Sequence, residues 1–186
     1  MIITITGKPC SGKSTIAKLL VEQHGFVRIG VGDIFKAEAH KRGMTTEEFN
    51  KFCMTDPSFD FVIDQQTAEL GKQYEGQKYI FDSRLAWHFV PKSFKVFVDL
   101  DREVSIERLI NSDRTGKEKY STREAAEATL ANRQVLEVDR YKQIYNIDLY
   151  DLAHYDLVID SENRTPQDLA DEVWQKYHEF CENNKD

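Results

Sequence analysis

The sequence predicts an α/β protein in which a five-stranded parallel sheet carries helices on both faces. Short runs of consecutive apolar residues, typical of strands buried on both faces, alternate with segments whose apolar residues recur at helical spacing. A glycine-rich turn joins the first such run to the first helical segment. Because 40% of the 186 residues are hydrophobic, we expect residues 1–186 to form a single domain with a substantial core.

The first half of the chain supplies two strands and four helices. The first strand covers residues 2–6, and Ile16, Leu19 and Leu20 mark the buried face of the helix that follows it. The second strand covers residues 26–29. Three helical segments follow: one from Asp33 to about Arg42, one after a capping box at residues 45–48, and one after Asp56 and Pro57, where an N-cap precedes a first-turn proline.

The second half of the chain completes the sheet. Each of its three strands ends on an aspartate, among them Asp82 and Asp99. Because ligands bind across the carboxyl ends of parallel strands, we expect both acids near the glycine-rich turn. Strands are predicted at residues 78–82, 94–99 and 156–160, and helices at residues 102–110, from a capping box at 121–124 to about Arg140, and after Thr165 and Pro166.

The turn at residues 7–14 reads Gly-Lys-Pro-Cys-Ser-Gly-Lys-Ser, a complete G-x-x-x-x-G-K-S phosphate-binding motif. Between a strand and a helix, its backbone N–H groups and the positive end of the helix can surround phosphate oxygens. Lys13 would reach the β- and γ-phosphates of a nucleotide, and the Ser14 hydroxyl would take one Mg²⁺ position. The alternative, a chance match, is rare in a chain of this length.

Charge and cysteine content disfavour several classes of protein. The net charge of −7 argues against nucleic acid or an acidic membrane as the main partner. The 3 cysteines are scattered without metal-ligand spacing, which fits a reducing compartment better than a disulfide framework. No apolar run approaches the length of about 18 residues that a membrane span needs, and we expect no signal peptide. The sequence therefore predicts a cytoplasmic protein.

Three features favour phosphoryl transfer over switching or motor activity. No Asn-Lys-x-Asp element for guanine follows a strand, and Asp82 is followed by Ser83 instead of a glutamate that could activate water. Basic residues also recur late in the chain, where Arg133 and Arg140 lie about two turns apart on one helix face. Arginines that converge on a triphosphate stabilise the transferred group. We expect alanine at either position to lower kcat with modest loss of thermal stability.

Each of these residues also has a purely structural interpretation. Arg133 and Arg140 could pair with Glu137 and Asp139 as a surface lattice. Asp82 could cap a helix or turn instead of holding a water on Mg²⁺. The remaining basic candidates, which could be phosphate ligands or solvated charges, are Lys36, Arg84, Arg114, Lys117, Lys119 and Arg123.

Five stretches, in the same order along nearly the whole chain, resemble the nucleoside monophosphate kinases and most closely the archaeal-type cytidylate kinase family. The first stretch is general to the superfamily, whereas the Arg-Tyr segment with its following Ile-Asp is more particular. The stretches are residues 5–15 (ITGKPCSGKST), 32–36 (GDIFK), 81–86 (FDSRLA), 140–148 (RYKQIYNID) and 155–159 (YDLVI).

The resemblance implies a three-layer P-loop kinase fold with a helical acceptor flap at about residues 33–75 and a short lid at about residues 111–120. It implies ATP with Mg²⁺ as the donor and CMP or dCMP as the acceptor, and we expect a monomer. The implied ATP ligands are Gly7, Lys8, Pro9, Cys10, Ser11, Gly12, Lys13, Ser14 and Thr15. The implied catalytic residues are Lys13, Arg114, Arg133 and Arg140, the acceptor ligands Asp33, Lys36, Arg84, Arg133 and Arg140, and the metal ligands Ser14 and Asp82.

Two positions depart from the family pattern. Lys36 stands where the wider superfamily usually has arginine, and Ser83 stands where the subfamily tends to have glycine. Asp64, Gln65 and Gln66 could read the acceptor base, although a solvated helix face explains them equally well. The alternatives are a kinase of the same fold that acts on another nucleotide or a small metabolite and, more remotely, a nucleotide-dependent switch or binding protein.

Overall fold

The computed structural model describes residues 2–73, 77–111 and 122–184. Most of the predicted lid, with Arg114, Lys117 and Lys119, therefore lies outside the described residues. Within these three ranges, none of the helices is long and apolar enough to cross a membrane.

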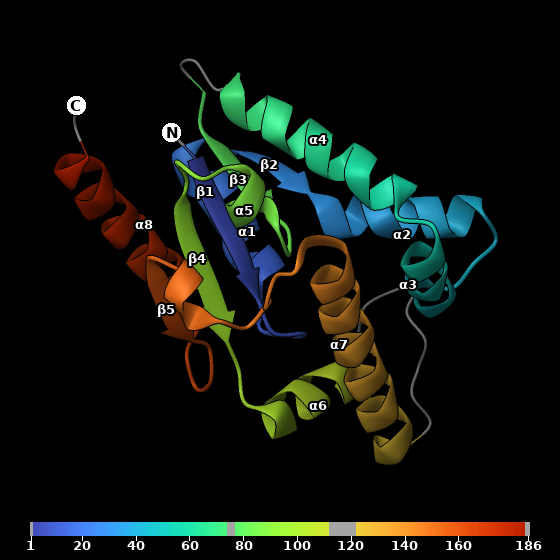
Figure 1. Cartoon of the computed structure of the whole chain (residues 1–186). Helices are drawn as coiled ribbons and strands as arrows, with labels where there is room; N and C mark the ends of the chain where they lie inside the picture. The colour runs from blue at the N-terminus through green and yellow to red at the C-terminus, as the bar shows by residue number, and fades with distance from the viewer. Residues whose placement is uncertain (1, 74–76, 112–121, 185–186) are drawn as a thin grey trace.

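The five predicted strands form one parallel sheet in the order β2-β3-β1-β4-β5. The first strand of the chain lies at the centre, so the glycine-rich turn emerges between the ends of β3 and β4 (Figure 1). The strands are β1 (Ile2–Gly7), β2 (Val27–Gly30), β3 (Tyr79–Asp82), β4 (Phe94–Asp99) and β5 (Leu157–Asp160).

One face of the sheet is covered by α1 (Lys13–His24) and α8 (Pro166–Asn183). The predicted cap of α8 is present, because the Thr165 hydroxyl accepts a hydrogen bond from the backbone of Asp168 at 3.1 Å. The apolar side chains between this layer and the sheet are removed from water, which is the main stabilising contribution to the fold. The core here contains Ile3, Ile5, Ile80, Val96, Val98 and Ile159 from the strands and Ile16, Ala17, Leu20, Leu169, Ala170, Val173 and Tyr177 from the helices.

The opposite face is covered by α4 (Ser58–Lys72) and by α5 (Ala86–Phe89). Strand periodicity sends alternate side chains to the two faces, so Ile2 packs here whereas Ile3 packs under α1 and α8. This second cluster contains Ile2, Phe81, Ala86 and Val90, with Ile29, Leu70 and Tyr79 packed against it. Helices on both faces give the three predicted layers.

The predicted acceptor flap is formed by three successive helices, α2 (Val31–Lys41), α3 (Thr46–Thr55) and α4, which lie together beside the sheet (Figure 1). They enclose an aromatic cluster of their own that includes Phe35, Phe49 and Phe59. The chain returns through α6 (Arg102–Ile110) to the long α7 (Arg123–Tyr145), which packs against α3. The flap and α7 therefore face each other near the carboxyl edge of the sheet.

Helix boundaries differ from the predicted ones by a few residues. Asp56 is not the N-cap of α4. Pro57 occupies that position, and the Asp56 carboxylate accepts a hydrogen bond from the Ser58 N–H at 3.1 Å. Likewise α7 begins with Thr122 as its N-cap, whose hydroxyl accepts from the Ala125 N–H, so the cap lies one residue later than predicted and is a single hydrogen bond instead of a capping box.

The structure also contains elements that the sequence did not predict. The short α5 and a 3₁₀ turn at Leu152–His154 have too few residues for a periodic pattern. Helix α2 begins at Val31, two residues before Asp33, and α7 runs past Arg140 to Tyr145.

Candidate active site

The loop between β1 and α1 has the backbone conformation that the phosphate-binding motif requires. Gly7 has φ of 149°, and a Cβ there would lie 2.2 Å from the Val98 carbonyl oxygen, so a larger residue would clash with β4. Gly12 is the left-handed N-cap of α1, with φ of 88° and no side-chain cap. The first N–H groups of α1 are therefore available to an anion, which the helix dipole also favours.

Side chains of the loop anchor it to its neighbours. Lys8 turns toward the end of β4, where its Nζ lies 2.7 Å from an Asp99 carboxylate oxygen. The Pro9 carbonyl accepts a hydrogen bond from the Ser105 hydroxyl of α6 at 3.2 Å. Ser11 is buried, and its hydroxyl finds no hydrogen-bond partner within the described part of the chain. These contacts fix the loop before any ligand binds.

A cavity opens from this loop toward the flap and α7. Its walls come from the start of α1, the end of β3, the helices α2, α3 and α4, and α7, which are far apart in the sequence. The sequence-predicted site residues that line it are Pro9, Cys10, Gly12, Lys13, Ser14, Thr15, Asp33, Lys36, Asp82, Arg84, Arg133 and Arg140.

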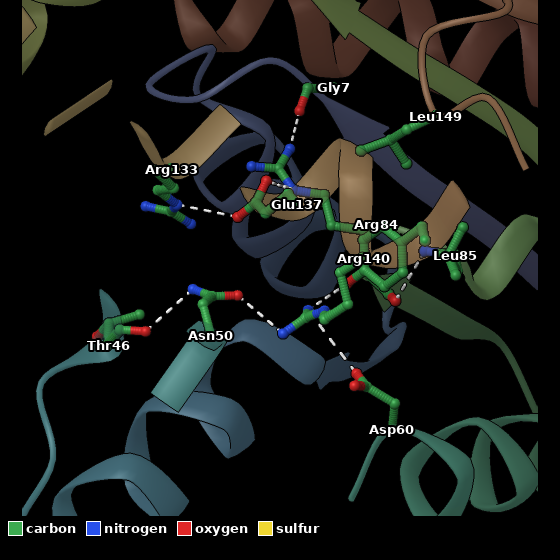
Figure 2. Close-up of polar contacts among 12 residues, drawn as sticks. Gly7, Thr46, Asn50, Asp60, Arg84, Leu85, Arg133, Glu137, Arg140 and Leu149 are labelled. Carbon is green, nitrogen blue, oxygen red and sulfur yellow. Dashed lines mark hydrogen bonds and ion pairs between the residues drawn. The ribbon is translucent and has the colours of Figure 1, made fainter. Parts of the chain in front are cut away.

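Glu137 of α7 links two of the predicted arginines. Its carboxylate pairs with the Nε atom of Arg84 at 2.9 Å and with that of Arg133 at 2.9 Å. Arg84 also donates from Nη1 to the Gly7 carbonyl, which ties the cluster to the phosphate loop (Figure 2). Its Nη2 is buried and has no hydrogen-bond partner in the described ranges, so it is available to a ligand.

The arginines set the charge of Glu137. Burial alone would raise the pKa of this carboxyl, but the charges of Arg84 and Arg133 outweigh burial and hold the pKa at about 2. Glu137 is therefore ionised at neutral pH and keeps both guanidinium groups in place. The cluster retains a net positive charge of one beside the phosphate loop.

The cavity disfavours the charged form of Lys13, whereas it favours the charged form of Glu137. Burial and the nearby positive charges of Arg84 and Arg133 lower the pKa of Lys13 to about 7, against the opposing effect of Asp82 and Glu137. Each of these neighbours belongs to the same cavity. A bound anion would relieve the excess positive charge, so the cavity is prepared for a ligand of high negative charge.

Asp82 is held by an arginine that the sequence analysis did not single out. Arg28 of β2 donates from Nη2 to the Asp82 carboxylate at 2.5 Å and from Nη1 to Asp33 at 2.9 Å. Lys36 lies one helical turn beyond Asp33, with its Nζ 3.6 Å from the Asp33 carboxylate, and its side chain is 48% exposed. Arg28 and Lys36 thus place two basic groups at this wall, each paired with a carboxylate.

The oxygen donors near the loop suit a Mg²⁺ ion that binds together with nucleotide phosphates. Mg²⁺ is usually held by one or two carboxylates plus substrate phosphates and waters. Ser14 and Asp82 offer one hydroxyl and one carboxylate in the same cavity lining. The described residues hold no cluster of three or more His, Cys, Asp and Glu that would bind a metal without a ligand. The donor set fits an ion that is shared with the phosphates.

Arg140 lies apart from the Glu137 cluster and contacts the flap (Figure 2). Its side chain is 3% exposed, and its Nη1 donates to the Asn50 side-chain oxygen at 2.8 Å. Its Nη2 donates to the Tyr141 hydroxyl at 2.9 Å and lies 3.7 Å from the Asp60 carboxylate. The alternative of a surface lattice is therefore wrong for Arg140, which contacts Asn50 of α3 and Asp60 of α4 instead of Asp139. Arg133 does pair with Glu137, but Glu137 is buried and shared with Arg84.

A second cavity lies on the other side of the phosphate loop. Its walls include Ser11 and Gly12, together with Arg164 and Pro166 at the start of α8. Arg108 of α6 reaches across it and donates to the backbone carbonyl of the loop after β5. That carbonyl belongs to Ser161 and lies 2.6 Å from the Arg108 Nη2. The two cavities therefore share the glycine-rich turn as a common wall.

Some of the polar groups of the cavity could not be identified from the sequence. Arg28 offered a weak signal, because it is a lone charge within a short, otherwise apolar predicted strand. Glu137 offered another, because it lies between two candidate arginines at helical spacing. Of the three residues considered for the acceptor base, Asp64 lines the cavity, whereas Gln65 and Gln66 are exposed. Ser83 is buried, and its hydroxyl accepts from the Leu85 N–H at 3.3 Å.

The parallel sheet with strand order β2-β3-β1-β4-β5 and the glycine-rich turn before α1 define a P-loop kinase fold. Shikimate kinase from Aquifex aeolicus superposes with a TM-score of 0.55 at 18% identity, covering 96% of each chain. Shikimate kinase from Bacteroides thetaiotaomicron gives a TM-score of 0.59 at 15% identity, covering 96% of this chain and 98% of that one. An uncharacterized protein from Eubacterium ventriosum gives 0.66 at 14% identity over similar shares. At these identities the likeness concerns the fold alone.

Within this class, the chain belongs to the cytidylate kinase-like family, whose sequence model matches residues 2–163. The cytidylate kinase of Methanocella arvoryzae is 40% identical over 161 residues, which cover 87% of each chain. The cytidylate kinase of Methanococcoides burtonii is 36% identical over 161 residues, again 87% of each chain. That of Methanocaldococcus jannaschii is 35% identical over 162 residues, covering 87% of this chain and 88% of that one.

Proposed function

We propose that this protein is an ATP-dependent nucleoside monophosphate kinase that converts CMP, and also dCMP, into the diphosphate with release of ADP. The observation that carries the proposal is membership of the cytidylate kinase-like family over residues 2–163. The main cavity supports the proposal, because residues of the glycine-rich turn and several basic side chains line the same space. This space could bring the phosphates of the donor and the acceptor together.

The donor phosphates are assigned to the glycine-rich turn. Residues 7–15 would surround the ATP phosphates with backbone N–H groups, and Lys13 would contact the β- and γ-phosphates. Ser14 and Asp82 would hold Mg²⁺, which neutralises phosphate charge when it is bound. The second cavity, which Arg108 and Pro166 line, would hold the adenine base of ATP, because it adjoins the glycine-rich turn.

The acceptor phosphate is assigned to the wall beneath the flap. Arg84 would bind it through its unpaired Nη2, and Lys36 would add charge from α2. Asp33 would act through Arg28 and Lys36, which it contacts. Arg133, whose side chain is 42% exposed, would face the γ-phosphate as it is transferred. Arg140 remains a substrate-binding candidate, but on the flap side of the cavity.

The reaction then needs positioning more than acid–base chemistry. An oxygen of the CMP 5′-phosphate attacks the γ-phosphorus of ATP and forms the new P–O bond. The bond from that phosphorus to the β–γ bridging oxygen breaks, and ADP leaves with its electron pair. The attacking group is already an anion, so no strong base is required. Lys13, Arg84 and Arg133 stabilise the charge that spreads over the transferred group.

The proposal is tested by following ADP release from ATP and Mg²⁺ with and without CMP. We expect ADP only when CMP is present, and CDP in equal amount. Lys13→Ala serves as the control. It should abolish turnover, because loss of one phosphate contact in the transition state typically costs several kcal/mol. The melting temperature should stay close to that of the wild type. ADP release that is independent of any acceptor would contradict a kinase. If neither CMP nor any other nucleoside monophosphate supported turnover, a small-metabolite acceptor would be favoured.

A further inference from the structure

The flap end of the main cavity has the features of a base-binding site. Phe35 of α2 and Phe59 and Ile63 of α4 line it with apolar surface, and the Phe35 ring lies under the Arg140 guanidinium, whose carbon is 4.9 Å from the ring centroid. Asp60 and Arg140 lie at the same wall, on the side of the Figure 2 cluster that is away from the phosphate loop. If phosphates bind at the loop, the acceptor base has this wall to read.

Two buried polar atoms at this wall have no partner in the described ranges. Oδ2 of Asp60 is an acceptor without a donor, and Nε of Arg140 is a donor without an acceptor. Both side chains are more than nine-tenths buried, at 8% and 3% exposure. They are also held side by side, because Oδ1 of Asp60 lies 3.7 Å from Nη2 of Arg140. Buried polar groups are normally paired, so these two neighbouring side chains present one unmet acceptor and one unmet donor.

The neighbouring acidic residue does not share this property. Asp64 lies one turn further along α4 and also lines the cavity, but its carboxylate accepts a hydrogen bond from the Tyr145 hydroxyl. Burial raises the pKa of Asp64 to about 6, against the effect of that bond. Arg140 in turn is held by Asn50 and Tyr141 through its two terminal nitrogens, which leaves Nε as its unused donor.

An acceptor beside a donor distinguishes the two pyrimidines. Cytosine carries a 4-amino donor next to the N3 acceptor, whereas uracil carries the 4-oxo acceptor next to an N3–H donor. We propose that Asp60 and Arg140 select cytosine over uracil, with Oδ2 of Asp60 accepting from the 4-amino group and Nε of Arg140 donating to N3. Against uracil, both positions would set like groups against each other and leave buried polar atoms unpaired.

This inference rests on the proposed function, and its test separates the two. The wild type is first assayed with CMP and UMP. Absence of turnover with CMP would overturn the proposed function and this inference together. Turnover of CMP with a strong preference over UMP supports the function and leaves the reading residues to be tested on their own.

The variants are Asp60→Asn and, as the matched control, Asp64→Asn. We expect Asp60→Asn to reduce the ratio of kcat/KM for CMP to that for UMP by about 10- to 100-fold, because the amide can donate to a 4-oxo group. Asp64→Asn should leave that ratio unchanged, whatever it does to the rates. An unchanged ratio in Asp60→Asn, with both substrates affected equally, would make Asp60 only an anchor for Arg140 and would overturn the inference.

A substrate-side test remains decisive if the Asp60→Asn variant does not fold. It uses the wild type with pyrimidin-2-one ribonucleoside 5′-monophosphate, which lacks the 4-amino group, and with 3-deazacytidine 5′-monophosphate, which lacks N3. We expect kcat/KM to fall by about 10-fold or more with each analogue, since each leaves one buried atom unpaired. Analogues that are used as well as CMP would overturn the assignment of the corresponding atom.

Discussion

Replacement of Glu137 by glutamine should destabilise the protein and loosen the phosphate site. Glu137 is 5% exposed and pairs with Arg84 and Arg133 through two contacts of 2.9 Å. The variant removes the negative charge but keeps nearly the same volume. Arg84, itself 9% exposed, would be left buried without its main counter-ion.

The magnitude follows from the ionisation of the carboxyl. A pKa that falls from the ordinary 4.5 to about 2 corresponds to about 3 kcal/mol of interaction favouring the ionised form. Breaking a buried ion pair costs about 3–5 kcal/mol in general, which agrees. For a chain of this size, a loss of about 3 kcal/mol would lower the melting temperature by roughly 6–12 °C.

The pH dependence gives an independent check. The pKa of Glu137 is depressed in the folded state, so its stabilisation is complete above about pH 4.5 and disappears as the pH falls toward 2. The difference in free energy of unfolding between the wild type and Glu137→Gln should therefore be constant near neutrality and shrink below pH 4.5. The kcat/KM of the variant should also fall, because Arg84 and Arg133 lose their common anchor.

The assay is urea denaturation at several pH values, with Asp139→Asn as the control. Asp139 is an exposed acid on the same helix, so its removal should change stability by less than about 0.5 kcal/mol. If Glu137→Gln and Asp139→Asn had the same stability and the same pH profile, the buried cluster would not have the energetic role given to it here.

Three further predictions concern residues of the same cavity. Lys13 has a pKa of about 7 without a bound anion, so binding of Mg-ADP above pH 7 should take up a proton. Calorimetry in buffers of different ionisation enthalpy measures this uptake, and Lys13→Arg should show none. Absence of proton uptake by the wild type would contradict the lowered pKa. Lys36→Ala should raise the KM for CMP more than that for ATP, with Lys36→Arg near the wild type, whereas equal effects on both substrates would place Lys36 elsewhere. Arg133→Ala should lower kcat with little loss of stability. Arg140→Ala leaves the buried Asp60 carboxylate without its counter-ion and should therefore cost about 3–5 kcal/mol of stability in urea titrations. Equal stability of the two variants would refute that contrast.

The last contrast differs from the expectation drawn from the sequence. The sequence alone favours a modest loss of stability for alanine at either Arg133 or Arg140, because two arginines seven residues apart on one helix look equivalent. The structure separates them, since one side chain is 42% exposed and the other 3% exposed. Burial depends on the flap helices that pack against α7, and helical periodicity carries no information about them.

Most of the fold could be predicted because its signals are local. Apolar runs marked all five strands, and the capping residues at Thr45 and Thr165 marked the helices that they begin. The order of the strands and the four-residue α5 could not be predicted in this way, because they depend on packing between distant segments and not on a periodic pattern.

The candidate site divides in the same way. The glycine-rich turn is contiguous, so its residues could be recognised together. The pairs that shape the rest of the cavity include Arg84 with Glu137 and Asp60 with Arg140, whose members are far apart in the sequence. Such pairs exist only after the flap, the sheet and α7 come together, so the sequence could supply the charges but not their partners.

The most direct measurement of the central claim is kcat/KM for CMP, dCMP, UMP, AMP and GMP at fixed ATP and Mg²⁺. We expect CMP first, dCMP close behind, UMP well below and both purines poor, because a site with fixed polar groups rejects a base that leaves them unpaired. AMP or GMP outranking CMP would contradict the account and leave only a kinase of this fold with another acceptor.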